Sequence, residues 1–413
     1  MPTMLTDDLG LYIHVPFCQR RCGYCDFFST EGKQKLLPGY LRALIREVRS
    51  VGAAGERPRV GSAYFGGGTP SLIDPDRMAM LLQEIRRAFR LSPDAEISME
   101  ANPGTVDSSR LARYRAAGIN RLSLGVQSAD DDELQMLGRI HTYPEAEQAY
   151  RDARRAGFAN VSLDLIYGLP GQTVATWERT LERALSLAPE HLSLYGLTLE
   201  RGTSLARLVR RGTLPAPEED AAADMYELAE EQLAAAGYRH YEISNWAKDG
   251  ESGIEAASKG SSGMEPMRFP KFACRHNLRY WLNLPYLGLG AGAHGCAAER
   301  RYHNVCSVEK YVEKMRNEVT RRFPLSPAAT LSRMRTREEE MRETMWLGLR
   351  LTEAGVDRGD YVRRFGTDYY DRFTREIDSV LSDHLAEWTE GQSSLRLTPQ
   401  GRLLGNRVFR LFV

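Results

Sequence analysis

Three of the six cysteines in this chain of 413 residues, Cys18, Cys22 and Cys25, lie within eight positions. Their Cys-x3-Cys-x2-Cys spacing puts three thiols on one compact segment, and Pro16 and Gly23 prevent that segment from forming a continuous helix. Thiolates select zinc, copper(I) or iron–sulfur clusters. A [4Fe–4S] cluster held by three cysteines leaves one iron without a protein ligand, where a small molecule can bind and be reduced. The segment therefore predicts such a cluster.

A structural zinc site is the alternative for the cysteine segment. His14, Asp26 or one of the distant cysteines Cys274, Cys296 and Cys306 would complete it. Structural zinc sites mostly use two spaced pairs of ligands, and no second pair is evident in the sequence. The distant cysteines also fit as small buried residues. We therefore favour the cluster over zinc and over a disulfide framework.

Six short apolar or β-branched segments alternate with longer segments of helical periodicity. The alternation predicts a parallel sheet, either doubly wound or closed into a partial or full barrel. Strands are expected over residues 11–15, 62–68, 96–102, 121–126, 160–170 and 191–200. Helices are expected between them over 40–51, 77–89, 109–118, 143–157 and 176–187, and again over 218–237.

Polar, glycine and proline residues follow each of the first five expected strands. Because the carboxyl ends of parallel strands meet at one edge, where such folds build their sites, we expect these stretches to converge on one pocket. They are the cysteine segment and residues 66–70, 100–105, 125–128 and 168–173. Residues 287–295, LGLGAGAHG, lack the arrangement of a dinucleotide site, which favours close packing of the backbone there.

The balance of charges bears on the class of partner. Fifty-five basic and fifty-five acidic side chains cancel, which argues against a nucleic-acid partner. The beginning of the sequence has no basic region before an apolar run, and no stretch of about eighteen apolar residues occurs. We therefore expect a cytoplasmic protein.

Six motifs occur in order: YIHVPFCQRRCGYCDFF, YFGGGTPSLI, GVQS, GRIHT, DLIYGLPGQT and YLGLGAGAH. With them the chain resembles the radical S-adenosylmethionine (SAM) proteins of the oxygen-independent coproporphyrinogen dehydrogenase group, HemN-like, and most closely its HemW branch of haem chaperones. The resemblance covers about Gly10 to the end, apart from 248–270. It implies that SAM chelates the open iron of the cluster, and that an electron from the cluster cleaves SAM to a 5′-deoxyadenosyl radical.

The resemblance also implies an α/β fold, a partial (β/α)6 TIM-like barrel with a small, mostly helical, winged-helix-like C-terminal domain. We expect a barrel core over residues 1–247 and a flexible insertion, rich in Gly, Ser and Lys, over 248–270. A segment that closes the barrel and carries the haem motif follows over 271–304. The helical C-terminal domain is expected over 305–413, where the alternation of strands stops.

Glycines after the second strand let the backbone approach a ligand closely. The resemblance implies that Gly67, Gly68 and Thr69 contact the amino-acid part of SAM, and that Tyr12 and Tyr24 flank the cluster. Without the resemblance, loop glycines fit equally as simple turn formers.

Four further polar residues suit the charges and hydroxyls of SAM. Glu100 and Asp164 fit its ammonium or ribose hydroxyls, and Gln127 and Arg139 fit its carboxylate or adenine edge. The resemblance implies that all four line the SAM site. Arg139 also fits as an ordinary surface arginine, whereas Asp164, inside an apolar run, needs a partner if buried. His14 fits either a hydrogen bond near the cluster or a core histidine.

Residues 274–281, CRHNLRYW, combine a histidine, two arginines and two aromatics. Haem takes an axial His or Cys, aromatic packing and cations for its propionates, although composition alone favours a polar edge with buried Tyr280 and Trp281. The resemblance implies haem binding through the HNxxYW pattern, with Cys274 as an alternative ligand to the histidine. The matching residues are His276, Asn277, Tyr280 and Trp281.

Two departures separate this chain from the HemN-type dehydrogenases. Phe27 stands where they carry another cysteine, and only seventeen residues precede Cys18. Both favour a haem chaperone over a radical enzyme that acts on a porphyrinogen, which is the alternative; a nucleic-acid-directed radical SAM protein is a third reading. The expected partners are haem and an acceptor protein, with respiratory acceptors and peripheral association with a membrane as expectations, in a monomer or homodimer.

Overall fold

The computed structural model describes residues 3–5, 8–250, 253–256, 267–317 and 322–413. The chain folds into two compact units. The first, here the sheet unit, consists of Leu9–Ala236 and Tyr286–Arg333. The second, here the composite unit, is assembled from Met1–Asp8, Gly237–Pro285 and Met334–Val413.

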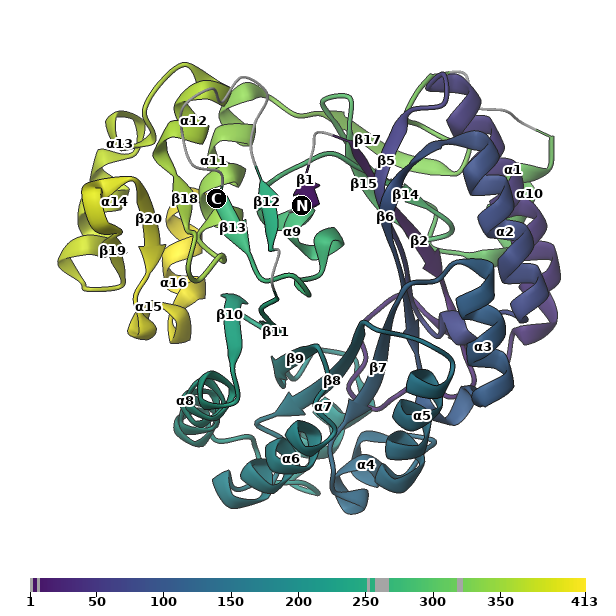
Figure 1. Cartoon of the computed structure of the whole chain (residues 1–413), viewed down its shortest axis with the longest axis horizontal. Coiled ribbons are helices and arrows are strands. Elements are labelled where there is room, and N and C mark those ends of the chain that lie inside the picture. Colours follow the sequence, from purple (N-terminus) through teal and green to yellow (C-terminus); the bar gives the residue numbers. More distant parts are fainter. Residues whose placement is uncertain (1–2, 6–7, 251–252, 257–266, 318–321) are drawn as a thin grey trace. The chain divides into compact units, whose positions relative to one another are not determined.

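The sheet unit is organised by a mostly parallel sheet (Figure 1). Neighbouring strands from β9 through β14 are parallel, and β15 and β16 then continue the sheet antiparallel. In spatial order the strands are β9 (His191–Gly196), β8 (Val161–Tyr167), β7 (Arg121–Gln127), β6 (Arg90–Ala101), β5 (Arg59–Gly67), β2 (Leu9–Val15), β14 (Tyr286–Leu289), β15 (His294–Ala297), β16 (Arg300–Asn304) and β17 (Ala329–Met334).

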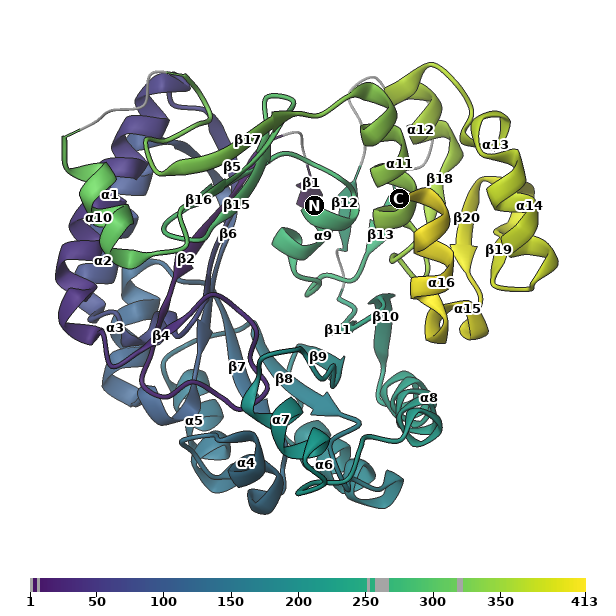
Figure 2. The ribbon, with the colours of Figure 1, turned by 180° about the vertical axis from the view of Figure 1, so that it is seen from behind.

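Helices follow the parallel strands, and α1, α2, α3 and α5 lie side by side along one face of the sheet (Figures 1 and 2). Their amphipathic pattern explains this: in α1 the buried residues Tyr40, Leu44, Val48 and Val51 recur every three or four positions. The helices are α1 (Leu37–Ala54), α2 (Pro75–Ala88), α3 (Ser108–Ala117), α4 (Asp131–Leu137), α5 (Tyr143–Arg155), α6 (Val174–Ser186), α7 (Ser204–Arg210), α8 (Glu219–Ala235) and α10 (Val308–Asn317).

The composite unit has two hydrophobic clusters and three small groups of strands. Its strands are the set β1 (Thr3–Leu5), β12 (Ile254–Ala256) and β13 (Met267–Phe269), the hairpin β10 (Tyr238–Glu242) and β11 (Asn245–Lys248), and the antiparallel set β18 (Val356–Asp357), β20 (Ser394–Leu397) and β19 (Ala386–Trp388). Its helices are α9 (Arg275–Trp281), α11 (Arg337–Gly348), α12 (Arg358–Phe365), α13 (Tyr369–Arg372), α14 (Thr374–Ser382), α15 (Pro399–Leu403) and α16 (Gly405–Phe409).

The expected alternation of strands and helices is confirmed. Each of the six expected strands and each expected helix overlaps an observed element, and α3 ends where Gly118 takes a left-handed conformation with φ 113°. The short helices α4 and α7 were not expected, because seven residues are too few to show helical periodicity. The helical region after Met334, with its small antiparallel sheet, fits the expected winged-helix-like C-terminal region.

The boundaries of the two units differ from the boundaries of the expected domains. Helix α10 and strand β17 belong to the sheet unit although they follow residue 305, because β17 extends the sheet beside β16. The expected insertion over 248–270 lies partly outside the described residues, and its described parts form β12 and β13. The expected domain boundaries stay a prediction.

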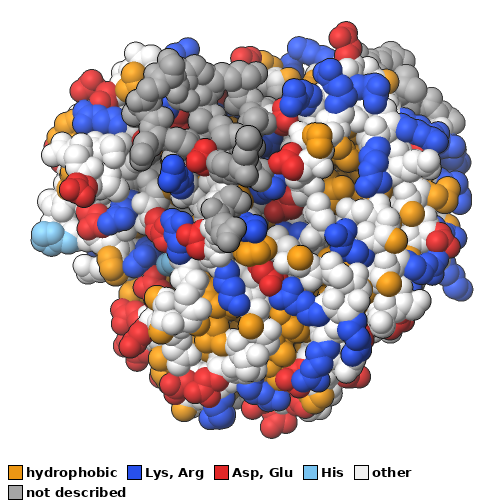
Figure 3. Space-filling view, viewed as in Figure 1, with side chains coloured by type: hydrophobic (Ala, Val, Ile, Leu, Met, Phe, Trp, Pro, Cys, Tyr) orange, Lys and Arg blue, Asp and Glu red, His pale blue; other side chains and the backbone are white. Residues whose placement is uncertain are grey.

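Both signs of charge are interspersed over the face drawn in Figure 3, as the balanced composition leads one to expect. Among the described helices, none has the length and apolar character needed to cross a bilayer.

A buried carboxylate joins three parts of the sheet unit. Glu47 on α1 is fully buried, and it accepts hydrogen bonds from the Gly290 backbone N–H at 2.7 Å, from Asn304 Nδ2 at 2.8 Å and from the Tyr311 hydroxyl at 2.6 Å. A Cβ at Gly290 would lie 2.4 Å from the Tyr40 hydroxyl, so the glycine-rich stretch packs its backbone closely, as expected. Glu47 thereby fixes α1 to the loop after β14, to β16 and to α10.

Replacing Glu47 by alanine should lower the free energy of unfolding by roughly 2–4 kcal/mol, because three buried donors lose their acceptor. Chemical denaturation of both proteins measures this loss. Glu309→Ala is the control, since that exposed carboxylate pairs with Lys33 and Ser307 at the surface, and its removal should cost less than about 1 kcal/mol. Equal effects of the two substitutions would contradict the importance of the buried network.

Candidate functional site

The pairing of β2 with β5 brings the glycine motif to the start of the cysteine segment. Val15 lies opposite Gly67 in the parallel register, and the Gly68 N–H donates to the Val15 carbonyl at 2.9 Å. Thr69 N–H then donates to the Phe17 carbonyl at 2.8 Å. A Cβ at Gly68 would lie 2.7 Å from that carbonyl oxygen, so only glycine allows this approach. The expected convergence of these two stretches is therefore observed.

Backbone hydrogen bonds hold the cysteine segment against α4 and α7. Gly23 N–H donates to the Leu137 carbonyl at 2.9 Å, and Leu205 N–H donates to the Gly23 carbonyl at 2.8 Å. The segment is the purple stretch that passes α7 in Figure 2. The two helices that sequence periodicity missed thus position the three thiols.

The three cysteines are free thiols close to one another. Cys18 is buried, whereas Cys22 and Cys25 are half-buried. Burial raises the pKa of the Cys18 thiol, and the nearby polar side chains of Thr69 and Ser29 oppose that rise. Burial likewise raises the pKa of Cys25, and the neighbouring Cys22 and Cys18 thiols add to the effect.

Arg139 places a cation directly beside this group of thiols. Its Nη1 donates to Cys22 Sγ at 3.3 Å and its Nη2 donates to the Gly125 carbonyl at 2.7 Å. The Tyr24 ring is also close, since Arg139 and Cys22 both influence the Tyr24 pKa, which burial raises. The reading of Arg139 as an ordinary surface arginine is therefore wrong.

The donor set fits a cluster better than a single metal ion. Among the described residues, no group of three or more His, Cys, Asp or Glu side chains is arranged to hold one ion. His14 is not available to complete a zinc site, because its Nε2 is 2.8 Å from the Phe28 carbonyl and its Nδ1 is 2.9 Å from the Tyr12 hydroxyl. A four-iron cluster spreads its ligands over different irons, so its three thiolates need not meet at one point.

Glu100 links the third strand to the glycine motif. Its Oε1 accepts from the Tyr64 hydroxyl at 2.8 Å and its Oε2 accepts from the Gly67 N–H at 3.2 Å. Burial raises the pKa of Glu100 to about 7. Tyr12 stacks on Tyr64 with ring centroids 6.4 Å apart, so Tyr12 lies in the same group.

Asp164 has the partners that its burial requires. The Ser123 hydroxyl lies 2.9 Å from each of its carboxylate oxygens, and the Ser162 hydroxyl lies 3.3 Å from Oδ1. Burial raises the pKa of Asp164 and these hydroxyls oppose the rise. Asp164 also lies opposite Gly125 in the register of β7 and β8.

A bulge at the end of β7 turns Gln127 toward this group. The register shifts between Gly125 and Gln127, and Gln127 has a left-handed backbone with φ 71°. A Cβ at Gly125 would lie 2.7 Å from Gln127 Nε2 and 3.3 Å from Arg139 Nη2, so these side chains cover the bare glycine backbone. Gln127 and Arg139 therefore lie together, as the sequence led us to expect.

Sequence reasoning missed three polar residues of this edge. Tyr64 donates a hydrogen bond to Glu100, and Ser123 donates one to Asp164. The alternation of side chains along a strand was the signal that could have revealed them. His141, in the GRIHT motif, is buried and bridges Asn102 Oδ1 at 3.1 Å and the Val126 carbonyl at 3.2 Å. It joins the loop after β6 to the end of β7.

The HNxxYW residues lie on α9 in the composite unit. His276 is 1% exposed, and its Nε2 is 2.9 Å from the Tyr280 hydroxyl one turn later. Their rings meet edge to face at 5.0 Å. Burial lowers the pKa of His276 to about 3, which keeps the imidazole neutral near pH 7. Asn277, Tyr280 and Trp281 are half-buried, and Cys274 is fully buried.

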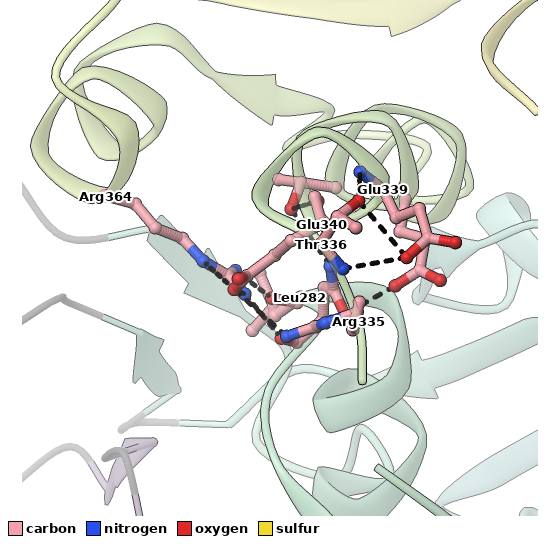
Figure 4. Close-up of polar contacts among 9 residues, drawn as sticks. Leu282, Arg335, Thr336, Glu339, Glu340 and Arg364 are labelled. Atoms are coloured by element: carbon pink, nitrogen blue, oxygen red, sulfur yellow. Dashed lines mark hydrogen bonds and ion pairs between the residues drawn. The ribbon is translucent and has the colours of Figure 1, made fainter. Parts of the chain in front are cut away.

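An ionic network fixes the end of α9 to α11 and α12 (Figure 4). Arg364 donates through Nη1 to the Leu282 carbonyl at 3.3 Å and through Nη2 to the Asn283 carbonyl at 2.9 Å. Arg335 Nη1 donates to Asn283 Oδ1 at 2.9 Å, and Glu340 pairs with both arginines. Asn283 is left-handed with φ 51°, which ends the helix. The network sets where the HNxxYW residues stand within their unit.

Known proteins resemble this chain in sequence and in fold. A family model described as the radical SAM superfamily matches residues 12–184. Heme chaperone HemW of Bacillus subtilis (strain 168) is 36% identical over 409 residues, 97% of this chain and 98% of that protein. Heme chaperone HemW of Mycobacterium tuberculosis (strain ATCC 25618 / H37Rv) is 37% identical over 406 residues, 97% of this chain and 94% of that protein.

One solved structure matches nearly the whole chain. It is coproporphyrinogen III oxidase (HemN) from Escherichia coli, described as a radical SAM enzyme, with a TM-score of 0.79 and 23% identity. The match covers 98% of this chain and 90% of that one. At this identity the likeness shows a shared fold alone.

Gly67→Ala should destabilise the site more than an alanine at another left-handed glycine. A Cβ at Gly67, where φ is 110°, would lie 2.5 Å from His14 Cε1, whereas Gly157, where φ is 86°, has no atom within 4 Å. Both changes cost about 1–2 kcal/mol of backbone strain, and the clash should add about 1–3 kcal/mol at Gly67 alone. Denaturant unfolding measures the loss in free energy of unfolding for each variant. Equal losses would contradict the prediction, because they would mean that the His14 side chain moves aside at no cost.

Proposed function

Because the chain belongs to the HemW family of radical SAM proteins, we propose that it binds haem and transfers it to an acceptor protein, and that it carries a [4Fe–4S] cluster and SAM. The observation that carries this proposal is that the chain combines a group of three neighbouring free thiols with an HNxxYW helix. An acceptor that is a respiratory protein, a peripheral association with a membrane, a monomeric or dimeric state and a cytoplasmic location stay predictions.

We assign the cluster to Cys18, Cys22 and Cys25. When bound, the cluster supplies an iron with an open coordination position and an electron for reducing what binds there. Arg139 donates a hydrogen bond to Cys22 Sγ, which stabilises the thiolate form that binds iron. Phe27, which is 70% exposed, stands at the position where HemN-type dehydrogenases carry another cysteine.

We assign SAM to the polar edge around the glycine motif. Gly67 and Gly68 add no side chain to this edge and donate their N–H groups to Glu100 and to the Val15 carbonyl, while the Thr69 hydroxyl offers a polar group for the amino-acid part. Glu100 and Asp164 offer carboxylates for its ammonium or ribose hydroxyls, while Gln127 and Arg139 offer donors for its carboxylate or adenine edge. Tyr12 and Tyr24 border this group.

We assign haem to α9. His276 is neutral in its buried position, and neutral imidazole is the form that binds haem iron. Its Nε2 faces the Tyr280 hydroxyl, so this nitrogen would hold haem iron only after that hydrogen bond is given up. Asn277 and Trp281 contribute the polar and aromatic surfaces of the same helix.

Single substitution of Cys18, Cys22 or Cys25 by serine should remove most of the cluster absorbance near about 400 nm after anaerobic reconstitution. Iron and sulfide analysis of the same samples gives a second readout. Cys306→Ser is the matched control because Cys306 is an exposed free thiol, and it should keep the full signal. A full cluster in all three single variants would overturn the assignment.

His276→Ala should change the Soret band of the haem-loaded protein and weaken haem binding by about tenfold or more, because an axial ligand is lost. Titration with haem under anaerobic conditions measures both. His384→Asn serves as control, since His384 is exposed and asparagine tolerates its left-handed backbone. If the spectrum and affinity of His276→Ala equal those of the original protein, Cys274 becomes the ligand to test.

A further inference from the structure

Arg350 stands at the seam between the two hydrophobic clusters of the composite unit, enclosed by aromatic rings. Its guanidinium carbon is 4.5 Å from the ring centroid of Phe409, 5.1 Å from that of Trp281 and 5.9 Å from that of Trp346. Phe409 and Trp346 belong to one cluster and Trp281 to the other. The arginine is half-buried among faces that attract a cation.

The guanidinium of Arg350 donates no hydrogen bond to any other described residue, and its Nε is buried without a partner. An arginine can donate five hydrogen bonds. Arg335 and Arg364 of the same unit use theirs on carboxylates and carbonyls. Aromatic rings hold this guanidinium in place, and its donors are unused. It can therefore donate hydrogen bonds to an acceptor group of a ligand.

Glu242 is the acidic group that acts electrostatically on Arg350. Its carboxylate is already engaged by the Ser244 N–H at 3.3 Å and by the Asn245 side-chain amide. At 1% exposed it is covered by protein. Glu242 therefore moderates the positive charge at Arg350 without occupying its donors.

We propose that Arg350 binds a carboxylate of the ligand that α9 takes, namely a haem propionate, while the exposed part of Trp281 packs against the porphyrin. This site rests on the proposed haem binding and extends it to a residue outside the HNxxYW pattern. His276 and Trp281 are five positions apart on α9, an axial distance of about 7.5 Å. That axial distance is on the scale of a porphyrin.

The test compares haem with its dimethyl ester, whose propionates carry no charge, in anaerobic Soret titrations. The proteins are the original chain, Arg350→Gln, Arg350→Lys and the control Arg342→Gln. Arg342 lies on α11, two residues beyond whose end Arg350 stands, and it also stacks on an aromatic ring, Phe373, but it already pairs with Glu338. Circular dichroism of each variant reports whether the fold is kept.

The original protein should bind haem about tenfold to a hundredfold more tightly than the ester, because a charge-assisted pair is lost with esterification. Arg350→Gln should lose the preference for haem over the ester, while its affinity for the ester stays within about twofold of the original. Arg350→Lys should keep part of the preference for haem, and Arg342→Gln should keep all of it. If Arg350→Gln weakens haem and ester equally, or neither, Arg350 is a structural residue and the site is overturned. If the original protein binds neither ligand, the proposed function itself fails, and the site with it.

Discussion

The parallel register of β2 against β5 is the constraint on which the candidate cluster and SAM site depends. Because Val15 lies opposite Gly67, the end of β2 and the end of β5 are adjacent. The cysteine segment, which follows β2, therefore begins beside the glycine motif, which ends β5. The hydrogen bonds from Gly68 and Thr69 to the backbone of the cysteine segment are possible only in this register. A shift by one residue would turn His14 and the glycines to the opposite face of the sheet.

Satisfaction of buried polar groups is what makes this edge stable. Glu47, Glu100 and Asp164 are carboxyl groups shielded from water, and each meets two or more donors, most of which come from neighbouring elements. Such contacts offset the cost of removing a charge from water and also fix the strands relative to their loops. Arg350 stands apart in the composite unit, since its charge is met by ring faces and not by acceptors.

The parts of the fold that arise from local periodicity were predictable, and the parts that arise from distant pairing were not. Alternating strands and helices and the convergence of strand ends follow from residue spacing alone. Sequence also indicated that a buried Asp164 needs a partner, but Ser123, 41 positions earlier, becomes that partner only through the register of β7 and β8. The bulge that turns Gln127 and the burial of His276 have no local signal either.

The interleaving of the two units also orders events during protein synthesis. The sheet unit needs residues up to Arg333, so its last strand can pair as soon as that segment has left the ribosome. The composite unit has to wait for Met334–Val413, although Met1–Asp8 and Gly237–Pro285 emerge long before. Domains generally fold as units while the chain grows. The segment that carries α9 therefore stays without α11 and α12 until they are synthesised, and only then can Arg335 and Arg364 fix its end.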